Sequence, residues 1–113
     1  MKSLGLCIGA STISAAGVCP ENGKYKLIES LNRPHDGNPR EALLAVLRSI
    51  DLKIYGSVAV TGRKFRSLTN LTSISEPEAV EVALSHFYPD MPLNAVISAG
   101  GENFLVYVIG KDR

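Results

Sequence analysis

The chain has 113 residues, of which 45% are hydrophobic and 20% charged, and its twelve basic and eleven acidic residues leave a net charge of +1. This length predicts one domain, or one domain with a piece of another, and the composition excludes a disordered chain. The balanced charge gives no electrostatic reason to bind nucleic acid or an anionic membrane. The apolar N-terminal run, interrupted at Gly5 and Gly9, is too short for a signal peptide or a membrane span. We therefore expect a cytoplasmic protein without nucleic-acid or membrane partners.

The two cysteines, Cys7 and Cys19, lie twelve positions apart and form no CxxC pair. A structural zinc or iron–sulfur site needs several ligands, so this chain cannot build one alone. Cys7 lies within an apolar run and is expected to be a buried thiol, whereas Cys19 precedes a proline and is expected to be more exposed. A disulfide between them is geometrically allowed, but a reducing compartment disfavours it.

Three consecutive strands are expected in the first third of the chain, at residues 3–8, 13–18 and 24–31. The sequence Asn22-Gly23 is a strong turn signal between the second and third strands. The third segment alternates between apolar and polar residues, so one of its faces should be solvated. Together these segments predict an antiparallel meander.

The next elements are a helix and a strand that it connects back to the meander. Asn38 is a helix N-cap, Pro39 suits the first helical position, and Glu41 follows three residues after the cap. Apolar residues then recur at helical spacing, which predicts an amphipathic helix over residues 38–51. The compact apolar run 57–61 is typical of an interior parallel strand reached by a helical crossover.

The last part of the chain repeats this pattern with weaker signals. Residues 71–74 are expected to form a short strand, and Ser75 with Glu78 forms a capping box at the start of a second helix that Pro89 ends. The apolar face expected on this helix consists of Val80, Ala83, Leu84 and Phe87. Segments 93–99 and 104–109 predict a closing hairpin. The order β-β-β-α-β-(β)-α followed by a hairpin predicts a mixed α/β fold with a ribonuclease-H-like mixed sheet.

Two glycine-containing turns are candidate anion sites. The first joins the first two strands at Gly9, Ala10, Ser11 and Thr12, where backbone N–H groups and two hydroxyls can meet a phosphate. The alternative is a glycine hairpin that serves only the fold, and the two interpretations have similar weight. The second turn comprises Gly100, Gly101, Glu102 and Asn103, for which we favour the structural interpretation.

Other polar residues have structural explanations that we favour over functional ones. His35 and Asp36 resemble a catalytic pair, but they precede a helix cap in a loop rich in proline and glycine, so turn chemistry explains them better. His86 is expected at the surface or boundary of the second helix. The basic segment 63–66 can meet phosphate or an acidic partner, although such short runs are usually solvated loops.

Five stretches carry a resemblance to a known family: Gly5-Leu6-Cys7-Ile8-Gly9-Ala10-Ser11-Thr12, His35-Asp36-Gly37-Asn38-Pro39, Val60-Thr61-Gly62-Arg63, Ser73-Ile74-Ser75-Glu76-Pro77-Glu78-Ala79 and Val96-Ile97-Ser98-Ala99-Gly100-Gly101-Glu102-Asn103. They resemble the sugar kinase, heat-shock 70 and actin superfamily. Within it, they are similar to the ATPases that activate 2-hydroxyacyl-CoA dehydratases and benzoyl-CoA reductase. The resemblance covers nearly the whole chain.

The resemblance implies a two-lobed ATPase in which two hairpins grip the nucleotide phosphates. Residues 1–90 would be lobe one, and residues 93–113 would be the opening hairpin of a truncated second lobe, packed on lobe one or swapped with it. The implied phosphate-binding residues are Gly9, Ala10, Ser11, Thr12, Gly100, Gly101 and Glu102. The complete parent would use ATP or ADP with magnesium and a bridging iron–sulfur cluster, whose cysteine ligands are not in this sequence. The implied partners are the rest of a longer chain and a CoA-ester dehydratase or reductase.

Several residues depart from the family pattern. The family has an aspartate in the first strand where this chain has Cys7, and another opening the second hairpin where it has Ser98. A later aspartate of the second motif is matched by Asn103. Such carboxylates hold Mg²⁺ or its waters during phosphoryl transfer, and a thiol or hydroxyl does not replace their charge. We therefore assign no catalytic and no metal-binding residues to this chain.

Two functional hypotheses follow. The first is a degenerate nucleotide-binding lobe of an activating ATPase, inactive as an isolated fragment. The second is a non-catalytic interaction or scaffold module that has lost nucleotide binding. Under the second hypothesis, the C-terminal hairpin adds to the sheet or mediates a homodimer, because an orphan strand pair leaves edges that can pair with other strands.

Overall fold

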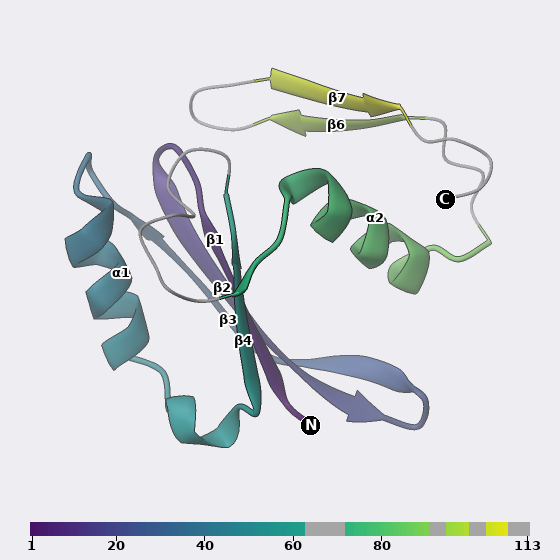
Figure 1. Ribbon diagram of the computed structural model, residues 1–113, viewed down its shortest axis with the longest axis horizontal. Coiled ribbons are helices and arrows are strands. Elements are labelled where there is room, and N and C mark those ends of the chain that lie inside the picture. Colours follow the sequence, from purple (N-terminus) through teal and green to yellow (C-terminus); the bar gives the residue numbers. More distant parts are fainter. Residues whose placement is uncertain (63–71, 91–94, 100–103, 109–113) are drawn as a thin grey trace.

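The computed structural model describes residues 1–62 and 72–90 and the strands 95–99 and 104–108. The elements are β1 (Ser3–Ile8), β2 (Thr12–Glu21), β3 (Lys24–Pro34), α1 (Pro39–Arg48), a 3₁₀ turn (Leu52–Ile54), β4 (Ser57–Thr61), β5 (Thr72–Ser73), α2 (Glu76–Phe87), β6 (Ala95–Ala99) and β7 (Phe104–Val108). They form a five-stranded sheet of order β3-β2-β1-β4-β5 and a separate two-stranded sheet of β6 and β7 (Figure 1). The expected mixed α/β class and the expected order of elements are confirmed. None of the described helices combines the length and the apolar character needed to cross a bilayer.

The meander has the expected topology, but two of its strands are longer than expected. β1 pairs antiparallel with β2, β2 pairs antiparallel with β3, and β4 pairs parallel with β1. The β2–β3 ladder runs from Thr12 opposite Pro34 to Glu21 opposite Lys24, and the Asn22–Gly23 turn closes it. The pairing continues through two prolines, because Pro34 lies in the edge strand β3 and Pro20 lies in the part of β2 that extends beyond its pairing with β1. Most residues of β3 are exposed on both faces rather than on one.

Helix α1 begins as expected and ends early. The Asn38 side chain accepts a hydrogen bond from the Glu41 N–H group at 3.3 Å and donates to Glu41 Oε2 at 2.9 Å. The regular helix ends at Arg48, three residues before the expected Asp51, and Asp51 instead caps the 3₁₀ turn. This connection returns the chain to β4 beside β1, as a crossover between parallel strands requires.

One face of the sheet carries the packed core. The odd-even alternation of β1 directs Leu4, Leu6 and Ile8 toward α1, and all three are at most 2% exposed. Burying side chains of this size contributes about 1.5–3 kcal/mol each, which makes this contact the main stabilising interface. The remaining members of the core are Ile13, Ala15, Ala42, Leu43, Val46, Ile50, Tyr55 and Val60.

The opposite face of the sheet carries small and polar residues, and α2 lies on that side (Figure 1). The Ser75 side chain caps α2 by accepting a hydrogen bond from the Glu78 N–H group at 3.4 Å, as the capping box predicted. The predicted apolar face is only partly correct: Val80 and Leu84 are half-buried, whereas Ala83 and Phe87 are exposed, and no residue of α2 is fully buried among the described residues. Small side chains on the sheet offer α2 too little apolar surface to bury its own.

The remaining strands differ in detail from the expectations. Only Val60 is fully buried in β4, so this strand is not apolar-packed on both faces. β5 has two residues rather than four. β6 and β7 pair with each other from Ala95 opposite Val108 to Ala99 opposite Phe104, which confirms the closing hairpin. This hairpin does not extend the five-stranded sheet.

Candidate functional site

The turn between β1 and β2 is closed by a backbone hydrogen bond. The Gly9 N–H group donates to the Thr12 carbonyl oxygen at 2.9 Å. A Cβ atom at Gly9 would lie 3.0 Å from that same oxygen, so the turn leaves little room for a side chain at this position. Ser11 is exposed at the tip, while Ala10 and Thr12 are half-buried. The sequence-predicted residues of the first candidate site therefore lie together in one tight loop at the carboxyl end of β1.

A buried histidine from the β3–α1 connection holds this turn. His35 is only 4% exposed, its backbone N–H group donates to the Ser11 carbonyl at 3.0 Å, and its Nε2 lies 2.9 Å from the Gly9 carbonyl oxygen. The Gly37 N–H group donates to Nδ1 at 3.2 Å, so Nδ1 is the acceptor and Nε2 carries the proton donated to Gly9. The ring thus connects two segments that are 26 positions apart in sequence.

The expected turn chemistry is confirmed for the residues after His35. Asp36 and Gly37 both have positive φ, 49° and 79°, and the Asn38 N–H group donates to the His35 carbonyl at 2.7 Å. The structural role of the His35 ring itself was missed by the sequence reasoning. Its contact with Gly9 has no local signal, because the pairing of β2 with β3 alone brings the two segments together.

These contacts occupy three carbonyl groups of the turn and leave two of its N–H groups available. The carbonyl groups of Gly9, Ser11 and Thr12 all accept hydrogen bonds. The backbone N–H groups of Ala10 and Ser11 donate no hydrogen bond to a backbone carbonyl of the described residues. Adjacent N–H groups of a turn that are not engaged in hydrogen bonds are an arrangement that can bind a phosphate.

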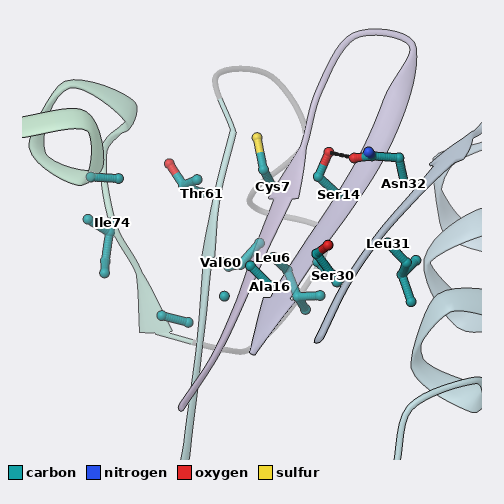
Figure 2. A pocket seen from close by; sticks show the side chains of 14 residues that line it. Leu6, Cys7, Ser14, Ala16, Ser30, Leu31, Asn32, Val60, Thr61 and Ile74 are labelled. Carbon is teal, nitrogen blue, oxygen red and sulfur yellow. Dashed lines mark hydrogen bonds between the residues drawn. The ribbon is translucent and has the colours of Figure 1, made fainter. Parts of the chain in front are cut away.

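Cys7 occupies the second part of the site, on the sheet face opposite α1. It lies between Ser14 of β2 and Thr61 of β4 in the register, and Figure 2 shows its thiol between those two side chains. The Ser14 hydroxyl donates to Asn32 Oδ1 at 2.6 Å. The Thr61 hydroxyl oxygen is buried without a hydrogen-bond partner in the described part of the chain.

These side chains line a pocket of about 380 Å³ whose floor is made of small residues, including Gly5, Ala16 and Ala59. Ala79 of α2 also lines it, as does Ile74, which follows β5 and is labelled in Figure 2. The pocket exists because the sheet presents no large side chain here. Its polar end coincides with the carboxyl ends of β1 and β4.

Burial and a nearby carboxylate make the thiol of Cys7 a weak acid. Its pKa is raised chiefly by desolvation and also by the charge of Glu76 in the first turn of α2. The prediction of a buried Cys7 and a more exposed Cys19 is wrong, since both residues are half-buried. Both are free thiols, as expected.

The donor set around Cys7 does not match a magnesium site. Mg²⁺ prefers six hard oxygen ligands, with one or two carboxylates among them, whereas a thiol is a soft ligand. Glu76 is the carboxylate whose charge acts on Cys7. No group of three or more His, Cys, Asp or Glu side chains suited to a metal ion occurs in the residues that the structure describes.

The strand end next to Cys7 is shaped by a close backbone approach. Gly62 has a φ of 141°, and a Cβ atom there would lie 2.3 Å from the Ile8 carbonyl oxygen. Only glycine allows β4 to turn so close to β1. This contact keeps the carboxyl ends of both strands together at the site.

The second candidate site cannot be placed. Gly100, Gly101, Glu102 and Asn103 lie outside the described residues, as does the basic segment 63–66. Ser98 lies in β6, of which only the backbone is described. His86 is half-buried on α2, near the boundary as expected, and its ring contacts those of Tyr25 and Phe87.

Comparisons with known proteins relate this geometry to solved structures. No family model and no curated protein matches the chain. Component A of the (R)-2-hydroxyglutaryl-CoA dehydratase from Acidaminococcus fermentans is similar to it with a TM-score of 0.73 and 18% identity, over 98% of this chain and 44% of that one. The activator of the 2-hydroxyisocaproyl-CoA dehydratase from Clostridium difficile, solved with bound ADPNP, gives 0.67 and 19%, over 96% and 46%. The Ppx/GppA family member from Aquifex aeolicus gives 0.64 and 13%, over 97% and 52%.

The chain therefore spans about half the length of these solved neighbours. The sequence identities are low, so the similarity concerns the fold. It agrees with the resemblance drawn from the five sequence stretches, since the neighbours include a component and an activator of 2-hydroxyacyl-CoA dehydratases. The chain therefore shares the fold of these solved neighbours, with a mixed five-stranded sheet and two helices.

Proposed function

We propose that this chain is a nucleotide-binding lobe of an ATPase-type activator of a 2-hydroxyacyl-CoA dehydratase or a related CoA-substrate enzyme. The observation that carries the proposal is the closed Gly9–Thr12 turn, in which the carbonyls of Gly9, Ser11 and Thr12 accept hydrogen bonds while the N–H groups of Ala10 and Ser11 are available. The hydroxyls of Ser11 and Thr12 would add contacts to the nucleotide phosphates. The partners would be the rest of a longer chain and the CoA-ester enzyme that it activates.

The proposal includes a degenerate metal site. Cys7 stands at the end of β1 where a magnesium-binding carboxylate would be needed, and burial keeps its thiol protonated. Magnesium, when present, would neutralise phosphate charge, and the residues that the structure describes include no group of three or more His, Cys, Asp or Glu side chains suited to hold it. We therefore expect nucleotide binding without hydrolysis and without a strong requirement for Mg²⁺.

Calorimetric titration with ADP and ATP, each with Mg²⁺ and with a chelator, tests the proposal. We expect binding in both conditions. The substitutions Ser11→Ala and Thr12→Val should each weaken it about five- to tenfold, the contribution of one hydrogen bond. Ser85→Ala, on the exposed side of α2, is the matched control and should leave the affinity unchanged.

Two results would contradict this function. Absence of nucleotide binding in the wild-type chain would leave Gly9–Thr12 as a turn that serves only the fold. Binding that disappears with the chelator would show that the metal site is not degenerate. Replacement of Cys7 by aspartate gives a further check, because it should make the affinity depend on Mg²⁺.

A non-catalytic interaction module is the second candidate, favoured by the isolation of β6 and β7. They form a two-stranded sheet of their own. Such a pair is marginally stable alone, and its unpaired edges can join strands from another chain. This function predicts a homodimer whose melting temperature does not change with ADP. Light scattering that gives a monomer at every concentration would exclude that dimer.

A further inference from the structure

We propose that His35 is a positioning residue for phosphate binding, which holds the Gly9–Thr12 turn in the shape that accepts an anion. The structural half of this inference rests on the geometry of the turn alone. The ligand half rests on the proposed nucleotide-binding function. His35 is not a catalytic residue in this proposal, because its ring acts on the turn through the Gly9 carbonyl.

The burial of His35 requires such a role for its ring. A polar ring that is 4% exposed must have hydrogen-bond partners, since an unpaired polar group in the interior destabilises the fold. Both nitrogens have them: Nε2 bonds to the Gly9 carbonyl at 2.9 Å, and Nδ1 accepts from the Gly37 N–H group at 3.2 Å. One side chain therefore fixes the β1–β2 turn and the turn before α1 at the same time.

The bond to Gly9 has a direct consequence for an anion. A carbonyl oxygen that faces a phosphate repels it, whereas N–H groups attract it. His35 draws the Gly9 carbonyl toward the protein interior through Nε2, and its own backbone N–H group does the same for the Ser11 carbonyl at 3.0 Å. Without the ring, the Gly9 carbonyl would be free to rotate toward the ligand.

The two ring functions can be separated by two conservative substitutions. A glutamine amide reaches about as far as Nε2, so His35→Gln keeps a donor for the Gly9 carbonyl. An asparagine side chain reaches only as far as Nδ1, so His35→Asn keeps an acceptor for Gly37 and loses the bond to Gly9. Both variants replace the same buried ring, so they differ mainly in the contact that the proposal concerns. His86→Gln on α2 is the control.

Amide hydrogen exchange measures how firmly the Gly9–Thr12 turn is closed, and it needs no ligand. The Gly9 N–H group is bonded to the Thr12 carbonyl, so its protection reports whether the turn is closed. We expect His35→Asn to raise the Gly9 exchange rate about five- to tenfold relative to Leu6 in the same variant, and His35→Gln to raise it about twofold. Equal protection in the wild type and His35→Asn, or equal loss in both variants, would overturn the proposal.

The wild-type protein offers a measurement that needs no variant. Nitrogen-15 spectra of the His35 ring distinguish its two neutral tautomers, and we expect the proton on Nε2, where Gly9 accepts it. A proton on Nδ1 would overturn the proposal, because the ring would then have no donor for Gly9.

Calorimetry with ADP and with adenosine tests the ligand half. His35→Asn should weaken ADP binding about five- to tenfold, the effect of one hydrogen bond, and leave adenosine binding unchanged. His35→Gln should restore most of the ADP affinity. If wild type binds no ADP, the nucleotide function fails and exchange at Gly9 still decides whether His35 holds the turn. If wild type binds ADP and His35→Asn binds it equally well, the function stands and the positioning role fails.

Discussion

The two faces of the five-stranded sheet differ in the size and burial of their side chains. The α1 face carries large branched side chains from β1, β2 and β4, and they interlock with Leu43 and Val46 of the helix. The α2 face carries small and polar residues, including glycine, alanine, serine, Cys7 and Thr61, and no residue of α2 is buried. The same strands supply both faces, because neighbouring residues of a strand point in opposite directions. One face is therefore a finished core and the other is the floor of a pocket.

The buried core that stabilises the fold and the pocket of the candidate site therefore lie on different faces of the sheet. Large side chains on the α2 face would fill the pocket and bury α2 more deeply, at the expense of the space beside Cys7 and Thr61. The candidate phosphate turn lies at the end of the strands, where both faces meet. His35 connects this turn to the stable side, because it enters the fold just before α1.

The largest expected effect comes from removing a side chain from the α1 face. Leu6 is 2% exposed, so Leu6→Ala should lower the free energy of unfolding by about 2–5 kcal/mol through lost burial and the cavity left behind. Val82 on α2 is 66% exposed, and Val82→Ala should change the stability by less than about 0.5 kcal/mol. Urea denaturation of both variants measures the contrast. Equal losses of unfolding free energy in the two variants would show that α2 is packed as tightly as the α1 face of the sheet.

A smaller effect is expected at Tyr55, whose hydroxyl donates to Glu29 Oε1 across the α1 face. Desolvation, followed by the hydrogen bond and the charge of Glu29, raises the pKa of Tyr55 to about 12. Because this exceeds the ordinary value of about 10, the contribution of the bond is complete below about pH 10 and is lost as the pH rises through about 12. Tyr55→Phe should reduce the free energy of unfolding by about 1–2 kcal/mol at neutral pH.

The pH dependence distinguishes this bond from simple packing. The difference in stability between the wild type and Tyr55→Phe should shrink between pH 10 and pH 12, as followed by circular dichroism in urea. Tyr25→Phe is the control, since Tyr25 is 55% exposed and should show little effect. A difference that stays constant over this range would contradict the role of the Glu29 contact.

The smallest expected effect concerns Cys7 on the α2 face. Its raised pKa leaves little thiolate at pH 8, so the thiol should react more slowly with an aromatic disulfide reagent than a free thiol does. Glu76→Gln removes the lesser of the two causes and should speed the reaction about twofold. The Cys19→Ser background isolates Cys7, and Glu81→Gln further along α2 is the control. An unchanged rate in Glu76→Gln would mean that burial alone sets the reactivity.

Much of the fold could be predicted from the sequence because its signals are local. The strand 3–8, the Asn22–Gly23 turn and the caps at Asn38 and Ser75 depend on residues within four positions of one another, and all occur as predicted. The errors lie where a distant segment decides the outcome. β2 and β3 extend past their expected ends because they pair with each other, and α2 stays exposed because the sheet face beneath it has small side chains.

The candidate site divides in the same way. The sequence by itself determined the glycine turn at Gly9–Thr12, the absence of an acid at position 7 and the turn at Asp36–Gly37, since each is a property of adjacent residues. Only the tertiary structure decided that Cys7 lies between Ser14 and Thr61, and that His35 is buried against Gly9. The contacts of Cys7 with Thr61 and of His35 with Gly9 join segments that are tens of residues apart, and strand pairing and helix packing bring them together.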